Sequence, residues 1–368
     1  MNILIVIGTR PELIKLAPVV YELRKSKINY QIINTAQHKD LLEPYWDIFG
    51  IMPDYSLNSM NHGQSLSALT ANLLIQMQNL IDKINLKIDL LIAQGDTTTV
   101  MVTSMIGFYN NIPFAHVEAG LRTSDLFNPF PEEYNRRITS ISSSLNFAPT
   151  SISKENLSKE NLQIENTYVT GNTVVDALKI ITKSDLFTQF KFKNENLLSL
   201  VKNKTVLITC HRRENHGENL NNIIQAILEL AKLYNEYIFV WPLHPNPNVK
   251  NTLLKSDINE QSNILLVEPL DYISLLKILE LSKFVITDSG GIQEESPSFG
   301  VPVVILREST ERPEGVNAGI AKLAGADKDK IIKTVKWADA YVFENKNNPY
   351  GEGNAAEEIV KIILKHYS

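Results

Sequence analysis

The chain has 368 residues, 43% of them hydrophobic, which is enough for two domains of ordinary size with a core in each. A formal net charge of -5 argues against nucleic acid or an anionic membrane as the main partner. The single cysteine, Cys210, excludes an internal disulfide framework and is typical of a reducing compartment, so we expect a cytoplasmic protein.

The first residues, MNILIVIGTRPE, are apolar for only a few positions before charged residues begin. This pattern predicts a first β-strand and lacks the basic start and longer apolar region of a signal peptide. No stretch approaches the roughly 20 apolar residues that a membrane-spanning helix needs. We therefore expect no membrane partner.

Short apolar runs alternate with helical patterns along the chain. The runs predict parallel strands covered on both faces, because they are nearly continuous and too short for helices. In the first half the expected strands are 3–7, 30–35, 88–94, 112–118 and 145–150, with helical spacing at 12–25, 64–83 and 97–109. The pattern then restarts, with strands at 205–210, 237–242, 263–268, 283–288 and 301–306. Two such series predict an α/β fold of two Rossmann-like, doubly wound domains facing a cleft.

We place an N-terminal domain at 1–170 and a second domain at 171–352. A last segment, 353–368, holds a predicted helix that the pattern alone allows to pack on either domain. Ligands of such sheets bind beyond the carboxyl ends of the strands. Polar clusters that directly follow strands are therefore the candidate site.

The motif GTRPE follows the first strand. Pro11 and Glu12 suit the first turn of a helix, so one interpretation is a capped strand-to-helix turn. In the other interpretation, Arg10 offers a fork of donors and Lys15 lies one turn into the helix, both facing a phosphate or a sugar.

Acidic residues follow the next strands. Asp96, in GDTTT, is a candidate base or orienting group, although the threonines alone could cap a helix. Glu118 ends an apolar strand, so we expect a partly desolvated carboxylate with a raised pKa. Glu132 opens a new helix, and its neighbour Glu133 is interpreted as a helix-N-terminal acid. Asp96, Glu118 and Glu132 together would supply an acid and a base for moving a proton at carbon. The arginines expected to balance this acidity are Arg122, Arg136 and Arg137.

The second half begins with CHRREN, in which His211 directly follows a strand. A histidine in this place is either structural or, with Arg212 and Arg213 beside it, a phosphate contact or an acid at a leaving group. His244 follows the next strand in the same way.

The motif TDSGGIQEES follows a later strand. Ser289, Gly290 and Gly291 stand at the start of a helix, where backbone N–H groups and the helix dipole favour an anion. Glu294 or Glu295, one turn on, could accept both hydroxyls of a ribose. The motif therefore predicts a seat for a nucleoside diphosphate, and the plainer alternative is an N-capped turn.

Other motifs are missing from the sequence. No Gly-Lys-Ser/Thr phosphate loop is present, which argues against ATP hydrolysis. No Cys or His pair has metal-ligand spacing. We expect neither a metal nor a cofactor.

The polar motifs, taken together, resemble those of the non-hydrolysing UDP-N-acetylglucosamine 2-epimerases. The resemblance covers nearly the whole chain in order and spacing: GTRPE, QHKD, GDTTT, HVEAGLRT, PEEYNRR, TGNTVVDAL, HRREN, HPNP, DSGGIQEE and ERPE. It implies a glycosyltransferase-B type fold, a C-terminal helix that returns to the first domain, and a homodimer. The implied reaction interconverts UDP-N-acetylglucosamine and UDP-N-acetylmannosamine through an enzyme-held glycal.

The resemblance also implies roles for individual residues. Catalysis falls to Asp96, Glu118, Glu132 and His211. Nucleotide-sugar contacts fall to Arg10, Lys15, Ser289, Gly290, Gly291, Glu295 and Arg312. Some members bind a second UDP-N-acetylglucosamine as an activator, and the positions that match that pattern are Gln37, Arg212 and His244. One departure is Leu270, where the family usually has a glutamine beside the uracil.

Four alternatives remain open. Hydrolysing 2-epimerases usually carry Arg-Ala-Asp where this chain has Arg10, Pro11 and Glu12. An epimerase of a modified UDP-N-acetyl sugar would tend to vary in GDTTT. A glycosyltransferase of this fold would need an acceptor site and not three acids in the first domain. A nucleotide-sugar sensor could lose the catalytic acids.

Overall fold

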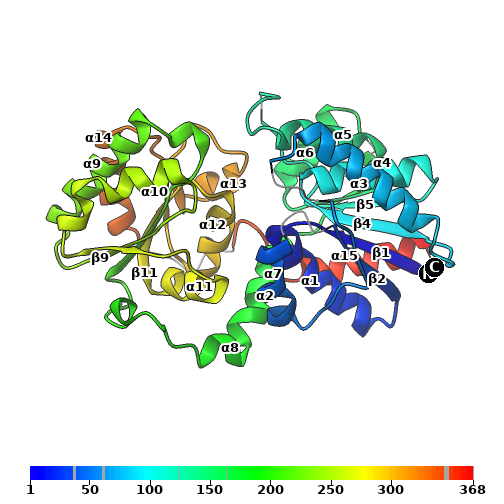
Figure 1. Cartoon of the computed structure of the whole chain (residues 1–368), viewed down its shortest axis with the longest axis horizontal. Coiled ribbons are helices and arrows are strands. Elements are labelled where there is room, and N and C mark those ends of the chain that lie inside the picture. Colours follow the sequence, from blue (N-terminus) through cyan, green and yellow to red (C-terminus); the bar gives the residue numbers. More distant parts are fainter. Residues whose placement is uncertain (36–38, 60–62, 124, 163, 344–347, 368) are drawn as a thin grey trace. The chain divides into compact units, whose positions relative to one another are not determined.

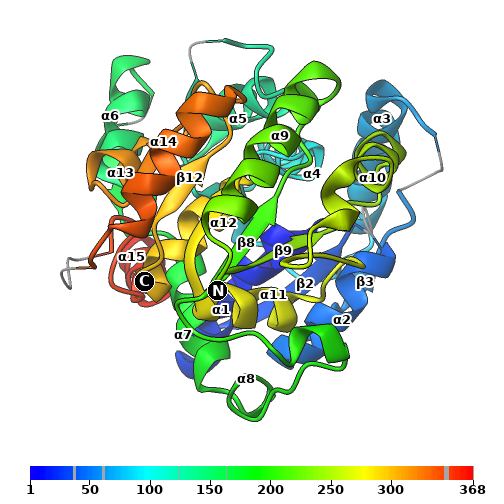
Figure 2. The ribbon, with the colours of Figure 1, turned by 90° about the vertical axis from the view of Figure 1, so that its left-hand side faces the viewer.

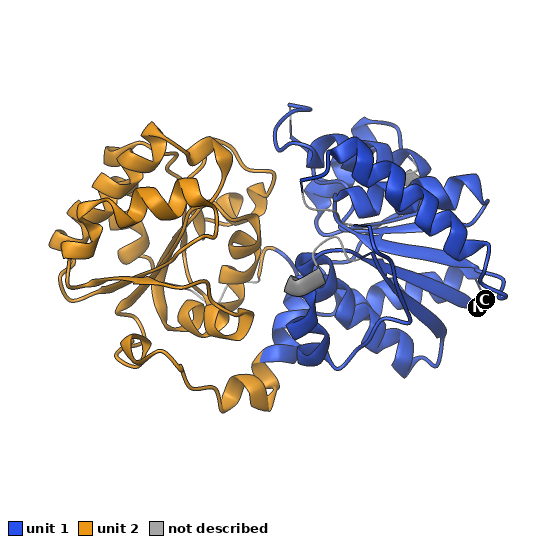
Figure 3. Cartoon of the chain, viewed as in Figure 1, with its two compact units in different colours: residues 1–181, 350–368 blue, residues 182–349 orange. Residues whose placement is uncertain are grey.

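The computed structural model describes residues 1–35, 39–59, 63–123, 125–162, 164–343 and 348–367. Contacts divide the chain into two compact units, shown in two colours in Figure 3. Unit 1 comprises residues 1–181 and 350–368, and unit 2 comprises residues 182–349. The sequence pattern placed these divisions at 170/171 and 352/353.

Unit 1 is built on a parallel sheet with the strand order β3-β2-β1-β4-β5-β6-β7. The strands are β1 (Asn2–Ile7), β2 (Asn29–Asn34), β3 (Tyr55–Ser56), β4 (Leu90–Gln94), β5 (Phe114–Val117), β6 (Leu145–Ala148) and β7 (Thr167–Val169). The sequence predicts all of them except β3 and β7, which have only two and three residues and make no apolar run. The order reverses between β1 and β4, so this is the switch point of the sheet.

The helices of unit 1 connect these strands (Figure 1). They are α1 (Arg10–Lys25), α2 (Lys39–Phe49), α3 (Leu66–Ile81), α4 (Thr98–Tyr109), α5 (Glu132–Ser142), α6 (Ser151–Lys159), α7 (Thr173–Lys183) and α15 (Ala355–Tyr367). The predicted helices at 12–25, 64–83 and 97–109 are confirmed as α1, α3 and α4. The final helix, α15, packs against α1, and Figure 1 shows the two side by side.

Unit 2 is also built on a parallel sheet, with the strand order β10-β9-β8-β11-β12-β13. Its strands are β8 (Thr205–Thr209), β9 (Ile238–Pro242), β10 (Ile264–Val267), β11 (Ser282–Thr287), β12 (Val303–Ile305) and β13 (Ala321–Leu323). Its helices are α8 (Asp185–Thr188), α9 (Glu218–Leu233), α10 (Pro247–Leu254), α11 (Tyr272–Leu281), α12 (Gly290–Glu295), α13 (Pro313–Asn317) and α14 (Lys328–Asp339). The switch point lies between β8 and β11, and Figure 2 shows α14 beside α9.

Each unit has its own apolar core between sheet and helices. In unit 1, Val6 of β1 packs with Leu73 and Met77 of α3. In unit 2, Trp241 of β9 belongs to a core that includes Ile227 of α9 and Val335 of α14. The predicted α/β class with two doubly wound domains is thus confirmed. No helix in the described part of the chain is both long and apolar enough to cross a membrane.

Candidate functional site

The polar motifs gather at the switch point of each sheet. In unit 1, GTRPE follows β1 and GDTTT follows β4. In unit 2, CHRREN follows β8 and TDSGGIQEE follows β11. Neighbouring parallel strands end at the same edge of a sheet, so each pair of motifs shares the place where such folds bind ligands.

Glu12 joins the two motifs of unit 1. Its Oε2 accepts the backbone N–H of Gly8 at 2.6 Å and of Thr9 at 3.3 Å, and its Oε1 accepts the hydroxyls of Thr9 at 2.9 Å and Thr97 at 2.8 Å. Burial raises the pKa of Glu12 to about 7, against the lowering effect of these hydrogen bonds. Gly8 is required by space, because a Cβ there would lie 2.3 Å from Thr99 Oγ1.

Glu118 and Lys15 form a buried ion pair at the end of β5. The expectation that the Glu118 carboxylate is desolvated is confirmed, since only 8% of the residue is exposed. The backbone of Glu118 has φ +67°, a conformation that a residue other than glycine seldom adopts. Strain of this kind persists only where the surroundings enforce it, and it is concentrated at functional sites.

Asp96 is held by α5. Its Oδ2 accepts two donors of the Arg136 guanidinium, at 2.5 Å and 3.2 Å, and its backbone carbonyl accepts Asn135 Nδ2 at 3.0 Å. Because α5 begins at Glu132, these contacts place the turn with Asp96 against the helix that carries the third candidate acid. Glu132 is partly exposed in the first turn of α5.

Glu133 lies in the first turn of α5, in keeping with its interpretation as a helix-N-terminal acid. It is also completely buried, and it accepts donors from Arg136 at 2.9 Å and Arg137 at 2.8 Å, which the sequence did not predict. Its backbone partner is the N–H of Thr123, at 3.1 Å. Of the three arginines expected to balance the acids, Arg136 contacts both Asp96 and Glu133, and Arg122 instead forms a two-pronged pair with Glu160.

His116 supports the turn before Asp96. Its Nε2 lies 2.7 Å from the carbonyl of Gly95, which can only accept, so Nε2 carries the proton. Burial lowers the pKa of His116 to about 4, although the bond to Gly95 acts in the opposite direction. His116 is therefore a neutral donor within the core.

One predicted residue of unit 1, Arg10, lies apart from these contacts. Arg10 is exposed, and its Nη1 lies 3.4 Å from the hydroxyl of Tyr45. Gln37 lies outside the described residues.

In unit 2, His211 lies against the carboxylate of Asp288. Its Nδ1 is 3.2 Å from Asp288 Oδ1, and its ring stacks on His244 with centroids 5.2 Å apart. Burial lowers the pKa of His244, while Asp288 acts to raise it. Sequence reasoning assigned no role to Asp288, although it stands directly before the Ser-Gly-Gly triplet.

Glu311 pairs with three arginines, two from its own segment and one from the turn after β8. Its carboxylate is 2.8 Å from Arg307 and 3.9 Å from Arg212, and it also pairs with Arg312. Burial acts to raise the pKa of Glu311, but Arg312, Arg307 and Arg212 outweigh it and hold this pKa well below the usual range. Glu311 therefore fixes two of the predicted binding residues, Arg212 and Arg312.

Arg312 lies directly over Gly290. A Cβ on Gly290 would be 2.7 Å from Arg312 Nη1 and 2.8 Å from its Cζ, so only glycine fits beneath the guanidinium. The Arg312 Nε donates to Glu294, which is buried. Glu294, one of the two acids that could have faced a ribose, is thus directed to this arginine.

The remaining predicted residues of unit 2 lie on α12 or at its start. Ser289 is the N-cap, and its backbone N–H donates to Thr287 Oγ1 at 2.9 Å. A Cβ on Gly291 would meet only Ser289 Oγ at 3.8 Å, so its surroundings are open. Glu295 accepts the hydroxyl of Tyr272 at 2.8 Å.

In unit 1 the structure therefore pairs Lys15 with Glu118 and, separately, Asp96 with the start of α5. In unit 2 it connects His211, Arg212, His244, Gly290 and Arg312. Among the described residues, no three or more His, Cys, Asp or Glu side chains are arranged to hold a metal ion. Among the contacts that sequence reasoning missed, Lys15 with Glu118 and His211 with Asp288 are long-range pairs, which leave no local signature in the chain.

Comparisons with known proteins agree with the motifs. The family model for UDP-N-acetylglucosamine 2-epimerase matches residues 21–364. The UDP-N-acetylglucosamine 2-epimerase of Neisseria meningitidis is 43% identical over the full length of both chains. That of Bacillus subtilis is 41% identical over all of this chain and 96% of its own.

A solved structure is similar throughout. The crystal structure of UDP-GlcNAc 2-epimerase from Neisseria meningitidis bound to UDP-GlcNAc has a TM-score of 0.90, with 99% of this chain and 100% of that chain covered. The resemblance inferred from the motifs is confirmed. The chain belongs to the UDP-N-acetylglucosamine 2-epimerase family.

Proposed function

We propose that the chain interconverts UDP-N-acetylglucosamine and UDP-N-acetylmannosamine without hydrolysing either one. The observation that carries the proposal is that two acids follow the neighbouring strands β4 and β5 of unit 1 and each pairs with a cation, Asp96 with Arg136 and buried Glu118 with Lys15. Membership of the epimerase family over the whole chain supports the substrate.

The chemistry requires a nucleotide and carboxylates together. The hydrogen on carbon 2 of the sugar is weakly acidic, so its removal is coupled to departure of a stabilised diphosphate. A carboxylate takes this proton, the bond from carbon 1 to oxygen breaks, and UDP leaves with the bonding electrons. The product is a 2-acetamidoglucal. Protonation of carbon 2 from the other face, and attack of a UDP oxygen on carbon 1, give the epimer.

Asp96, Glu118 and Glu132 supply the base and the acid for the two faces. Arg136 fixes the direction of the Asp96 carboxylate. Lys15 is the counter-charge of buried Glu118, so a substrate group that contacts one lies beside the other. Such positioned acid–base groups accelerate proton transfer by roughly 10²- to 10⁴-fold.

The residues of unit 2 bind the UDP moiety. Arg312 contacts the diphosphate, held in place by Glu294 and Glu311. The backbone at Ser289, Gly290 and Gly291 offers N–H donors, and Glu295 accepts ribose hydroxyls. Arg10 and Lys15 complete the nucleotide-sugar contacts, and His211 acts at the leaving diphosphate.

Arg212 and His244 both adjoin His211 and are proposed to contact an activating UDP-N-acetylglucosamine, together with Gln37. We further propose a cytoplasmic homodimer. The buried, unpaired Cys210 fits a reducing compartment.

Two alternative activities differ in their products. A hydrolysing epimerase would release free N-acetylmannosamine, and the Arg10-Pro11-Glu12 sequence disfavours it. An epimerase of a modified UDP-N-acetyl sugar would prefer another substrate over UDP-N-acetylglucosamine.

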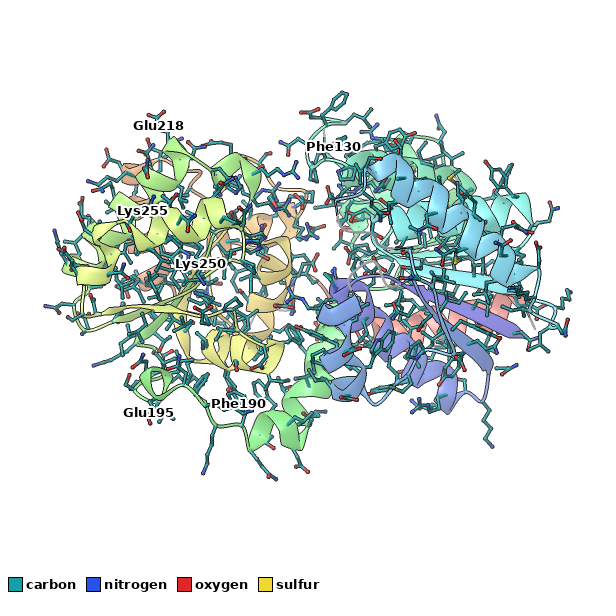
Figure 4. All side chains as sticks on the ribbon, viewed as in Figure 1. Phe130, Phe190, Glu195, Glu218, Lys250 and Lys255 are labelled. Carbon is teal, nitrogen blue, oxygen red and sulfur yellow. The ribbon has the colours of Figure 1, made fainter. Side chains whose placement is uncertain are left out.

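The deciding experiment incubates the pure protein with UDP-N-acetylglucosamine in deuterated water and follows the proton spectrum. We expect UDP-N-acetylmannosamine with deuterium on carbon 2. Glu218→Gln is a matched control, because Glu218 is exposed at the start of α9, where Figure 4 labels it. Release of free sugar, or no exchange of the carbon 2 hydrogen, would refute the proposal.

A further inference from the structure

A completely buried carboxylate, Asp288, directly follows β11 and contacts the turn that follows β8. Its Oδ2 accepts three N–H donors at 2.9 Å, namely the backbone groups of His211 and Arg212 and the side-chain amide of Asn215. Its Oδ1 lies 3.2 Å from Nδ1 of the His211 ring. One carboxylate thus contacts both the backbone and the ring of the same histidine.

Elementary hydrogen bonding decides which ring nitrogen holds the proton. The three partners of Oδ2 can only donate, so this oxygen is an acceptor. Within the described part of the chain, His211 is the one side chain with a cationic form inside ion-pair distance of Asp288. Asp288 Oδ1 is buried and accepts no hydrogen bond within the described part of the chain, and it lies 3.2 Å from His211 Nδ1. A buried carboxylate oxygen needs a donor. The Cys210 thiol also contacts Asp288 but is a weak donor, so an N–H at His211 Nδ1 is the stronger donor within reach.

The plane of the ring is fixed by a second contact. His244 stacks on His211 with an angle of 17° between the rings. His244 Nδ1 in turn accepts the backbone N–H of Asn246 at 3.2 Å, which sets the orientation of the stacking partner. The His211 ring therefore stacks on His244 at its face, and its Nδ1 edge faces the Asp288 carboxylate.

We propose that Asp288 is a positioning residue that keeps His211 in the Nδ1–H form and leaves Nε2 as the ring atom that serves the substrate. The claim that Nε2 serves the substrate rests on the proposed function of His211. The claim that Asp288 sets the tautomer is independent of that function. In a neutral imidazole, a proton on Nδ1 makes Nε2 an acceptor, and a carboxylate beside Nδ1 stabilises the ring when Nε2 gains a proton.

The test is Asp288→Asn. The amide oxygen of asparagine can still accept the donors that bind Oδ2, while its NH₂ group then faces the ring. His211 Nδ1 must become the acceptor, so the proton moves to Nε2. We expect this inversion in the ¹⁵N spectrum of His211 at about pH 9, where imidazole is neutral. We also expect kcat to fall roughly 10²- to 10⁴-fold with KM changed by less than about threefold.

Asn215→Ala is the matched control. Asn215 donates to Asp288 and also to the carbonyl of Leu306 at 3.0 Å, so its loss loosens the same turn without changing the partner of the ring. We expect a lower melting temperature with the His211 tautomer retained and kcat within about threefold of wild type. The signal among the seven histidines is assigned with His211→Asn.

The outcomes distinguish a failure of the Asp288 proposal from a failure of the proposed epimerase function. The proposal is overturned if Asp288→Asn keeps the proton on Nδ1, if its kcat stays near wild type, or if Asn215→Ala inverts the tautomer as well. If wild-type protein forms no epimer, the proposed function fails, and the ¹⁵N spectra still decide whether Asp288 sets the tautomer.

Discussion

Glu12 accepts a hydrogen bond from Thr97 Oγ1 at 2.8 Å, so a single buried acid connects the turns after β1 and β4. Burial raises the pKa of Glu12 from 4.5 to about 7. Folding therefore takes up a proton at this carboxyl between these two pH values. The stabilisation is complete below pH 4.5 and is lost as pH rises through about 7.

Glu12→Gln should remove this pH dependence. Its amide oxygen can accept the backbone donors of Gly8 and Thr9, and its NH₂ can donate to the two threonine hydroxyls. Urea unfolding at pH 5 and pH 8 measures the effect. The free energy of unfolding of wild type should fall by about 2–3 kcal/mol more than that of the variant over this interval. If the free energy of unfolding fell equally in wild type and in Glu12→Gln, Glu12 would not hold a proton in the folded state.

Removing one member of the buried Lys15–Glu118 ion pair should destabilise the folded protein. Glu118→Gln takes away the negative charge facing Lys15, and we expect a loss of about 3–5 kcal/mol in the free energy of unfolding. Lys15→Met combined with Glu118→Gln replaces both charges, so most of that stability should return. Exchange at carbon 2 should remain absent in both variants. If the double variant is as unstable as the sum of the single ones, the two residues are not coupled.

Asp96→Asn should separate catalysis from folding. Arg136 keeps its bond to Glu133 in this variant, so the fold should lose less stability than in Glu118→Gln. Exchange of the carbon 2 hydrogen should fall by at least about 100-fold, whereas UDP affinity measured by calorimetry should stay near that of wild type. Loss of UDP binding along with exchange would mean that Asp96 has a structural role.

Local patterns predict the strands and helices that position the site, because buried parallel strands and amphipathic helices leave periodic signals of their own. Local patterns do not determine strand order. His211 and Asp288 are 77 residues apart, and Lys15 and Glu118 are 103 apart. Such pairs meet only because β8 lies beside β11 and because β1, β4 and β5 are consecutive in their sheet.

Neighbouring positions on a helix are hard to separate by sequence. Glu132 and Glu133 both suit the first turn of α5, yet Glu132 is partly exposed, whereas Glu133 is completely buried and pairs with Arg136 and Arg137. Successive residues of a helix point about 100° apart, so the choice depends on which face meets the protein interior. The backbone conformation of Glu118 is a second feature that sequence does not indicate. It is left-handed, and glutamate has no preference for that conformation.

The proposed homodimer has a candidate surface on unit 1. The helices α3, α4 and α5 pack in succession and expose large apolar side chains, which are Ile75, Phe108, Tyr109, Tyr134 and Ile141. Phe130, labelled in Figure 4, is also exposed just before α5. Large exposed apolar side chains on neighbouring helices are typical of an interface.

Phe108→Glu should therefore shift the protein from dimer to monomer in sedimentation equilibrium at concentrations where wild type is dimeric. Phe108 is 70% exposed, so the folded protomer should keep its melting temperature. Leu198→Glu is the control, because this leucine of unit 2 is also exposed, at 63%. A monomeric wild type, or a dimer disrupted only by Leu198→Glu, would contradict the assignment.

The two glycines of α12 should respond differently to the same change. Gly290→Ala places a Cβ 2.7 Å from Arg312 Nη1, which forces the guanidinium away from Glu294 and Glu311. We expect a loss of about 1–3 kcal/mol in stability and weaker UDP binding. Gly291→Ala meets only Ser289 Oγ at 3.8 Å, and alanine favours a helix by about 1 kcal/mol, so stability should be kept or increased.

The UDP affinity of Gly291→Ala tests whether a phosphate contacts the backbone at Gly291. If a phosphate approaches the backbone there, the added methyl of Gly291→Ala obstructs it, and calorimetry should record weaker binding at an undiminished melting temperature. Wild-type affinity in Gly291→Ala would show that the phosphate does not contact this residue. An unchanged melting temperature in Gly290→Ala would show that Arg312 is free to move, and that its pairing with Glu294 and Glu311 does not stabilise the fold.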